Sequence, residues 1–314
     1  MRGPDGAQPT TSGHDRPPRP HPGERPFWIA NQPGFRFTES PPGSAAFYAD
    51  IERHRYALEP STREMAGFGR WSGCDVLEAG CGIATDGINF ARAGARYVGV
   101  DLTTSALELA ERRFAMEGQV GRFVPGSVTE LPFADASFDL VYSCGVIHHV
   151  ADTRRAVAEF HRVLRPGGQA IVMVYHRDSL NYRMSIMIVR RALVGALLIP
   201  GMTGVVSRTT GEAVGLLEEH EALLRAHGIA YLTDRERFLH HNTDGPGNPL
   251  SKVYSRSQAR ELFSDFARVA VRPRFLNLRV YPAGERLAAT RVARALERRI
   301  GWHLWVDARK AGGE

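Results

Sequence analysis

The chain of 314 residues contains only three cysteines, Cys74, Cys81 and Cys144. None belongs to a CxxC motif or to a cluster of cysteine and histidine with the spacing of a zinc site. Cys81 and Cys144 also fall where we expect turns at the ends of strands, which does not suit a disulfide framework. The low count therefore argues against a disulfide-stabilised fold and against bound zinc, and it predicts a reducing, cytoplasmic location.

Long apolar runs are missing as well. The most apolar segment, residues 185–206, is interrupted by Arg190, Arg191 and Pro200. Its uncharged stretch before the proline is shorter than the roughly 20 residues that a membrane-spanning helix needs. Residues 1–33 lack the apolar core of a secretory signal peptide. We therefore expect neither a membrane span nor secretion.

The composition favours a globular protein, with 43% hydrophobic and 24% charged residues, in one large domain or one domain with an insertion. The net charge of +6 comes from arginine far more than from lysine. High arginine, alanine and glycine contents are as typical of a GC-rich genome as of a surface that binds polyanions, and no appended RNA- or DNA-binding module is present. The charge alone therefore does not indicate a nucleic-acid partner.

Short apolar runs typical of strands alternate with helical segments between residues 75 and 176. We expect helices over 85–94, 104–117 and 153–164, and strands over 75–80, 96–101, 121–127, 138–145 and 168–175. Such alternation predicts an α/β fold with a doubly wound, mostly parallel sheet. A strand near 267–275, a basic helix near 284–299 and a last strand over 302–310 close the chain.

The segments around this core suggest further divisions. Residue patterns predict a disordered tail over 1–33, a helical cover over 34–74 and the core over 75–176. They also predict an inserted lid after the fifth strand, over 177–254, and a C-terminal part of the same sheet over 255–314. The apolar segment 185–206 and the aromatic-rich segment 25–37 are expected to bury a substrate together.

The sequence VLEAGCGIATDG, residues 76–87, places a glycine-rich turn directly after a strand. The third glycine of a dinucleotide-binding fingerprint is absent, because Thr85 occupies that position. Glu78 ends the strand, where a carboxylate would repel a pyrophosphate but suit a cationic ligand. Asp101 ends the next strand, 21 residues after Gly80, where an acid can accept two ribose hydroxyls. The turn thus favours a nucleoside with a positive charge over NAD.

The ordered set VLEAGCG, VGVD, LPFADASFDLVYS, VIHHV and VLRPGG resembles the class I S-adenosylmethionine (SAM)-dependent methyltransferases. It is similar in particular to the broad group that includes the ubiquinone and menaquinone C-methyltransferases. The resemblance covers residues 75–176, and more loosely 44–74 and 255–310. It implies a methyltransferase with SAM as its cofactor and a sheet of seven strands, the last antiparallel and placed between the sixth and the fifth.

The resemblance also implies which residues bind SAM: Glu78, Ala79, Gly80, Cys81, Gly82, Asp101, Leu102, Ser127, Val128 and Ser143. Asp101 is expected to bind the ribose, although it can instead cap the following helix. Ser127 stands where the family often has an acid for the adenine amino group. In the cover, Arg55 is a candidate for the methionine carboxylate and Tyr56 for a position over the sulfonium; a solvated arginine and a packed tyrosine are the alternatives.

Methyl transfer to a hydroxyl requires removal of a proton, which a neutral imidazole can accept because its ordinary pKa is about 6.5. The candidate catalytic residues are His176, which follows the fifth strand, His149, which follows the fourth, and Tyr175 as an orienting neighbour. Other histidines placed near the predicted cleft are His148, His240 and His241. An amine acceptor would need only alignment, so a base is not obligatory.

The absence of signatures known from other methyltransferases narrows the class of acceptor. The segment SCGVIHHV after the fourth strand lacks both the Pro-Pro-aromatic signature of enzymes that methylate nucleic-acid amino groups and the paired glutamates of protein arginine methyltransferases. Asp152 and Asp178 are metal-ligand candidates by position only, so no metal is predicted. We expect O- or N-methylation of a small or medium-sized molecule. C-methylation of a lipid-like or polyprenyl acceptor and a non-catalytic SAM-binding protein are the alternatives, and the oligomeric state is not indicated.

Overall fold

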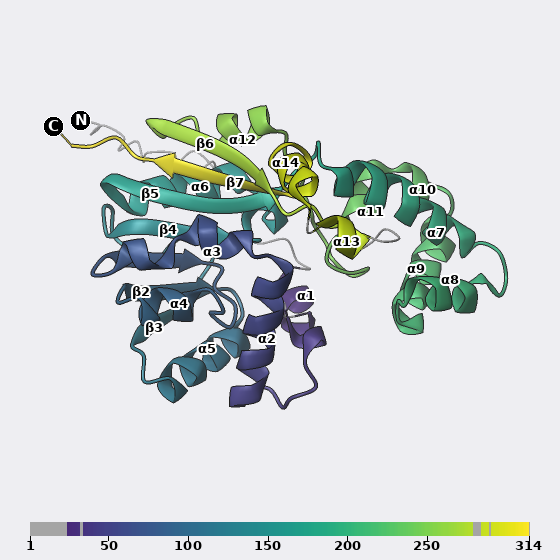
Figure 1. Cartoon of the computed structure of the whole chain (residues 1–314), viewed down its shortest axis with the longest axis horizontal. Helices are drawn as coiled ribbons and strands as arrows, with labels where there is room; N and C mark the ends of the chain where they lie inside the picture. Colours follow the sequence, from purple (N-terminus) through teal and green to yellow (C-terminus); the bar gives the residue numbers. More distant parts are fainter. Residues whose placement is uncertain (1–23, 32–33, 279–283, 289, 314) are drawn as a thin grey trace, which may run out of the picture.

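The computed structural model describes residues 24–31, 34–278, 284–288 and 290–313 (Figure 1). Its centre is a seven-stranded sheet in the order β3-β2-β1-β4-β5-β7-β6. The strands are β1 (Asp75–Ala79), β2 (Arg96–Asp101), β3 (Gly121–Pro125), β4 (Phe138–Cys144), β5 (Leu164–Tyr175), β6 (Arg268–Arg274) and β7 (His303–Arg309). β7 runs antiparallel to both of its neighbours. The predicted fold, including the place and direction of the last strand, is confirmed.

Alternate residues of the strands point to opposite faces of the sheet, and each face has its own apolar core. Val76, Tyr142 and Met173 belong to one core, which α4 (Gly87–Arg92) and α5 (Thr104–Met116) help to form. Leu77 and Val172 belong to the other, which includes side chains of α6 (Thr153–Val163) and α12 (Arg256–Leu262). The sheet is therefore covered on both faces, as a mostly parallel sheet requires.

The cover lies beside the sheet as α2 (Ala45–Leu58), α3 (Ser61–Ala66) and the short turns η1 (Phe35–Phe37) and η2 (Phe68–Trp71). Ser44 caps α2 by accepting a hydrogen bond from the Phe47 amide. The boundary between the two helices falls at Pro60 and Ser61.

The N-terminal prediction needs correction. Residues 1–33 were expected to be disordered, but Glu24–Ala30 form a helix, α1, and Phe27 in it is buried. The aromatic and aliphatic side chains of this stretch allow it to pack. Residues 1–23 and 32–33 lie outside the described part of the chain.

The insertion forms a separate helical lobe that extends from one end of the sheet (Figure 1). Its elements are η4, a π-helix (Asn181–Arg190), α7 (Arg191–Ala196), α8 (Met202–Thr210), α9 (Val214–His227), α10 (Ala230–Thr233) and α11 (Arg235–His240). Val194, Val206, Leu217 and Tyr231 are buried in this lobe. No described helix is both long enough and apolar enough to traverse a bilayer.

The C-terminal part returns to the sheet. After β6 come α13 (Gly284–Ala288) and α14 (Arg291–Ile300), and then Gly301 and Trp302 lead into β7. Residues 303–309 of β7 pair with residues 169–175 of β5 in a continuous antiparallel register, so His303 lies opposite Tyr175. This pairing brings the start of β7 to the same end of the sheet as the carboxyl end of β5.

Candidate active site

A cavity of about 520 Å³ lies at the carboxyl ends of β1, β2, β4 and β5. Residues of α1, η1 and α2 form its other wall, and Trp28, Phe35 and Leu58 are among them. Ligands in doubly wound folds bind at this end of the sheet. The cavity is therefore the candidate active site.

The glycine-rich turn after β1 forms the floor of the cavity. The amides of Gly80 and Cys81 donate to the Val100 carbonyl at 2.7 and 2.9 Å, which fixes the turn against β2. Gly80 has φ +80°, and a Cβ there would lie 2.4 Å from Val146. Gly82 also has positive φ, but a Cβ there would meet no atom within 4 Å. Since Gly82 lines the cavity, its missing side chain leaves room for a ligand at the backbone.

Asp101 ends β2 and lines the cavity. Its Oδ2 accepts the Gly82 amide at 2.8 Å, and its Oδ1 accepts the amide and the hydroxyl of Thr103 at 2.9 and 2.7 Å. The carboxylate thus holds both the turn and the start of α5. Because each carboxylate oxygen has two acceptor positions, Oδ2 can still accept a ribose hydroxyl. The two roles considered from the sequence are compatible.

The other cofactor candidates divide into two groups. Leu102, Ser127 and Val128 line the cavity beside Asp101. Ser127 Oγ lies 2.8 Å from the Thr129 hydroxyl and accepts the Thr129 amide at 3.2 Å. Ala79 and Ser143 do not line the cavity, because the Ser143 hydroxyl donates to the Ala79 carbonyl at 2.8 Å and ties β4 to β1.

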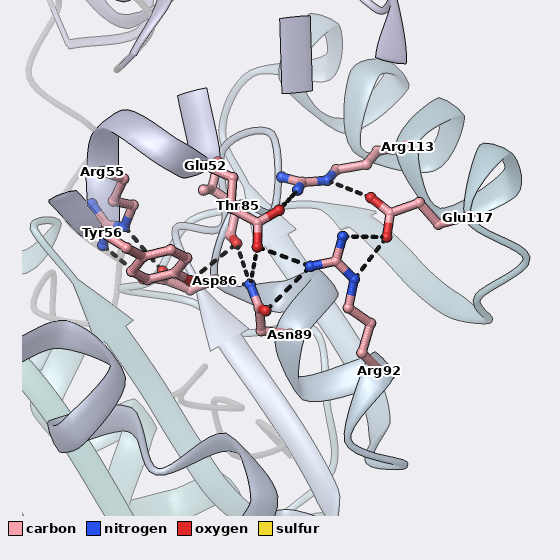
Figure 2. Close-up of polar contacts among 9 residues, drawn as sticks. All are labelled: Glu52, Arg55, Tyr56, Thr85, Asp86, Asn89, Arg92, Arg113 and Glu117. Carbon is pink, nitrogen blue, oxygen red and sulfur yellow. Dashed lines mark hydrogen bonds and ion pairs between the residues drawn. The ribbon is translucent and has the colours of Figure 1, made fainter. Parts of the chain in front are cut away.

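Arg55 reaches the cavity from α2 and forms a two-pronged ion pair with Asp86 (Figure 2). Arg55 Nε lies 2.9 Å from Asp86 Oδ1, and Nη2 lies 2.6 Å from Oδ2. The Tyr56 and Tyr142 hydroxyls each donate to the same carboxylate at 2.8 Å. Burial alone would raise the pKa of Asp86, but the Arg55 charge and these hydrogen bonds hold it below its usual value.

Tyr56 lies behind this ion pair and does not line the cavity. Its ring contacts the Arg63 guanidinium, which lies 4.1 Å from the ring centre. The structure therefore gives Tyr56 the packed position that was the alternative to a place over a sulfonium. Arg55 remains at the cavity wall, with Asp86 as its partner.

A second charged group anchors α2 to the sheet domain (Figure 2). Glu52 pairs with Arg113 of α5 and, at 2.8 Å, with Arg92 of α4. Asn89 donates to the Glu52 carboxylate at 3.2 Å and to the Tyr56 hydroxyl at 3.1 Å. The cover is thus bound through α2 to the two helices that follow β1 and β2.

Glu78 lines the cavity beneath the turn and is almost fully buried. The Tyr97 hydroxyl donates to its Oε2 at 2.5 Å. Burial raises the pKa of Glu78 well above its usual value, and the negative charge of Asp86 acts in the same direction. The Glu78 carboxyl therefore holds its proton to a higher pH than an exposed glutamate, and a cation beside it would favour the charged form.

The opposite end of the cavity contains His149 and Tyr175, as the sequence predicted, and also Asp244 of the insertion. The Tyr175 hydroxyl donates to Asp244 Oδ1 at 2.9 Å, and His149 Nε2 lies 3.3 Å from Asp244 Oδ2. His149 Nδ1 lies 2.7 Å from the Leu250 carbonyl. Trp28 packs edge-on against the His149 ring, with 4.9 Å between ring centres.

His303 and Glu59 line the same end and were not among the residues singled out from the sequence. Glu59 caps α2 at its C-terminus, and its Oε2 lies 3.9 Å from His303 Nδ1. Burial lowers the pKa of His303, although Glu59 acts in the opposite direction. His303 could have been predicted from the strand order. If β7 is assumed to pair with β5, His303 lies opposite Tyr175.

His176, one of the candidate catalytic residues predicted from the sequence, does not reach the cavity. Met173 and Tyr175 line the cavity, and side chains alternate along a strand, so the residue after Tyr175 turns away. His176 is buried, and its Nδ1 lies 2.9 Å from the Gly301 carbonyl. It connects the end of β5 to the segment before β7.

The remaining histidine candidates also lie off the cavity: His148, His240 and His241. His148 is buried with its ring centre 3.9 Å from that of Tyr175, and burial lowers its pKa well below the usual value. The apolar segment 185–206 does not line the cavity either, because its buried residues pack within the lobe. Among the described residues, no group of three or more His, Cys, Asp or Glu could hold a metal ion.

The comparisons with known proteins agree with this geometry. Residues 77–172 match the family described as Methyltransferase domain. An uncharacterized methyltransferase of Mycobacterium sp. (strain JLS) is 38% identical over 138 residues, which are 44% of this chain and 52% of that protein. A demethylmenaquinone methyltransferase of Clavibacter sepedonicus is 35% identical over 97 residues, 31% of this chain and 39% of that protein. The chain spans about half the length of the first of these relatives.

A solved structure with a similar fold is that of magnesium protoporphyrin IX methyltransferase from Synechocystis PCC 6803 with bound SAH. It has a TM-score of 0.50 and 15% identity, with 91% of this chain and 98% of that chain covered. This likeness concerns the fold, whereas the match over 77–172 concerns the segments that build the turn, Asp101 and β4. Residues 77–172 therefore form a methyltransferase domain of the kind found in the class I S-adenosylmethionine-dependent methyltransferases.

Proposed function

We propose that this protein transfers the methyl group of SAM to a hydroxyl or amino group of a small molecule. The observation that carries the proposal is the continuity of one cavity between two chemically different ends. Asp101, Ser127 and Val128 lie at one end, and His149, Tyr175 and Asp244 lie at the other. A nucleoside cofactor and an acceptor could therefore occupy one continuous space.

The residues at the first end fit SAM. Asp101 is available for the ribose, the small turn residue Gly82 leaves room for the methionine part, and Leu102 offers an apolar contact for the adenine. Glu78 becomes a negative partner when a cation approaches, since its raised pKa then falls. SAM supplies an electrophilic methyl group on a sulfonium.

The residues at the second end would align the acceptor and move its proton. Tyr175 is held by Asp244, and His149 is held by the Leu250 carbonyl, so both rings have a defined orientation. His149 Nε2 would accept the proton of an acceptor hydroxyl while Met173 and Trp28 exclude water. Proximity and orientation would supply most of the remaining rate enhancement.

The test uses methyl-labelled SAM. The purified protein is incubated with the label and with fractionated extracts of small metabolites, and products are detected by intact mass. We expect the label in a metabolite together with the demethylated cofactor, and at least about tenfold less product from the Asp101→Ala variant when SAM is below saturation. Binding of NAD without binding of SAM would refute the proposal. Binding of SAM without transfer to any fraction would instead indicate a non-catalytic SAM-binding protein.

C-methylation of a lipid-like acceptor is a second candidate. The lobe carries exposed large apolar side chains at Met184, Ile188, Leu198, Ile199 and Val205. Such a surface suits contact with an apolar molecule or assembly. The same experiment with an organic-solvent extract would place the label in the lipid fraction if this candidate is correct.

A further inference from the structure

Two pairs of histidine and carboxylate border the acceptor end of the cavity. In the first, His149 Nε2 lies 3.3 Å from Asp244 Oδ2; in the second, His303 Nδ1 lies 3.9 Å from Glu59 Oε2. All four residues line the cavity. Each of these four atoms is buried and makes no hydrogen bond to any residue that the structure describes. Buried polar atoms without a hydrogen bond are rare in proteins, and here four of them lie in one place; Arg55 Nη1 also lies 4.0 Å from Glu59 Oε2.

Tyr175 links the two pairs. Its ring centre lies 5.8 Å from that of His149 and 6.4 Å from that of His303, and its hydroxyl donates to Asp244. Burial raises the pKa of Tyr175, and the charges of Asp244 and Glu59 act in the same direction. The side chains of both pairs are therefore close enough to Tyr175 for one small molecule to contact them together.

The hydrogen-bonding state of His149 follows from its neighbours. A backbone carbonyl only accepts, so His149 Nδ1, at 2.7 Å from the Leu250 carbonyl, carries the hydrogen. In the neutral ring Nε2 is then an acceptor, and it faces the carboxylate of Asp244, which is also an acceptor. The pair lacks a donor between its two atoms. A hydroxyl group of the acceptor would supply it.

The second pair has the same need. The 3.9 Å between His303 Nδ1 and Glu59 Oε2 is too long for a direct hydrogen bond. A group of the acceptor that carries a hydrogen could bond to either atom. Burial lowers the pKa of His303, so its ring is neutral at pH 7.

The charges on the cavity wall also limit which acceptors can bind. The acidic residues that line it are Glu59, Glu78, Asp86, Asp101, Asp152 and Asp244, whereas the arginines are Arg36 and Arg55. Arg55 is already paired with Asp86. An acceptor with a carboxylate or a phosphate between the two pairs would be repelled by the carboxylates of Asp244 and Glu59, while Arg55 is held by Asp86.

We infer that the acceptor is a neutral or cationic small molecule with at least two hydroxyl or amino groups, and that the two pairs bind one group each. This inference rests on the proposed function. The hydroxyl between His149 and Asp244 is the one methylated. Its O–H bond breaks as the proton passes to His149 Nε2, an O–C bond forms to the methyl carbon, and the C–S bond breaks with its electron pair left on sulfur. Asp244 stabilises the imidazolium, which later loses its proton to water. The group held by His303 and Glu59 positions the molecule and is not methylated.

The first test is the composition of the labelled product from the metabolite extracts. We expect one methyl ether and at least one remaining hydroxyl or amino group, with no carboxylate or phosphate. A labelled product that carries an acidic group, or that has no remaining donor, would overturn the inference while leaving the methyltransferase proposal intact. No labelled product with SAM bound would defeat the proposed function and, with it, this inference.

The second test separates the two pairs kinetically with that product's precursor. Glu59→Gln and His303→Gln should raise KM about 10- to 100-fold, the effect of losing a hydrogen bond to a charged partner, with kcat changed by less than about twofold. His149→Gln should lower kcat about 10²- to 10⁴-fold. Asp244→Asn should also lower kcat, because the imidazolium formed during the transfer then lacks its negative partner.

His161 provides the control, since it lies on α6 away from the cavity. His161→Gln should change neither constant. Calorimetric SAM affinity within about threefold of wild type shows that each variant is folded. If His303→Gln does not fold, His303→Asn takes its place. Equal changes of KM in His161→Gln and His303→Gln, or a loss of kcat without a rise of KM in the Glu59 variant, would contradict the positioning role.

Discussion

Replacement of Asp86 by asparagine tests whether the cover is held to the cofactor turn by a buried ion pair. Asp86 has 3% of its side chain exposed and Arg55 has 26%. The asparagine keeps the shape but removes the charge, and its amide nitrogen faces donors from Arg55, Tyr56 and Tyr142. Removing one partner of a buried pair costs about 3–5 kcal/mol. Because Arg55 borders the cavity, we expect the lower end, about 3 kcal/mol of unfolding free energy.

The measurement is urea unfolding, followed by tryptophan fluorescence, for wild type, Asp86→Asn, Arg55→Met and the double variant. Either single change strands a buried partner, whereas the double change removes both. The loss of unfolding free energy in the double variant should therefore be smaller than the sum of the two single losses by at least about 2 kcal/mol. This difference lies within the range of interaction energies known for contacting residues. Additive losses within about 0.5 kcal/mol would refute the reasoning.

The pH dependence gives an independent check. The pKa of Asp86 lies below its usual value of 3.8 in the folded protein. A carboxyl with a lowered folded pKa stabilises the fold above its unfolded pKa, and this contribution disappears as pH falls through the folded value. The stability difference between wild type and Asp86→Asn should be constant above about pH 5 and shrink below pH 4. A difference independent of pH in this window would mean that the carboxylate charge is not what stabilises the contact.

Three further outcomes are expected. Asp101→Ala should weaken calorimetric SAM binding by about 1.5–3 kcal/mol for each ribose hydrogen bond lost, and unchanged affinity would remove Asp101 from the cofactor site. SAM binding should release a proton from Glu78, seen as heats that vary with the buffer's ionisation enthalpy, and Glu78→Gln should abolish this variation. Gly82→Ala should weaken SAM binding because its methyl group enters the cavity, whereas Gly73→Ala, which also has positive φ and open space around its Cβ, should cost similar stability without affecting binding.

The cofactor end of the cavity could be predicted because contiguous segments build it. Glu78 and Ala79 end β1, the turn at Gly80 to Gly82 follows it directly, and Asp101 ends the strand that pairs with β1 in parallel. In a parallel sheet the carboxyl ends of adjacent strands meet at one edge, so the motif spacing already implies the contact. The hydrogen bond from the Gly82 amide to Asp101 is the contact that this spacing implies.

The error at His176 has a physical reason. Residues 170–175 of β5 are all apolar or aromatic and all buried, because the strand is covered on both faces. Such a strand has no alternation of polar and apolar residues. The sequence therefore does not tell which set of alternate side chains, odd-numbered or even-numbered, faces the cavity. The structure shows that Met173 and Tyr175 do, and the histidine after them therefore cannot. A one-residue difference in parity moves a side chain to the other face of the sheet.

The acceptor end could not be assembled from the sequence because three distant segments meet there. Glu59 comes from the end of α2, Asp244 from the loop after α11, and His303 from the start of β7. Only the last has a local rule behind it, since an antiparallel β7 beside β5 places His303 next to Tyr175. The positions of Asp244 and Glu59 depend on how the lobe and the cover pack around that tyrosine. Substrate choice in this protein therefore depends on contacts that form only when the cover, the lobe and the last strand are all in place.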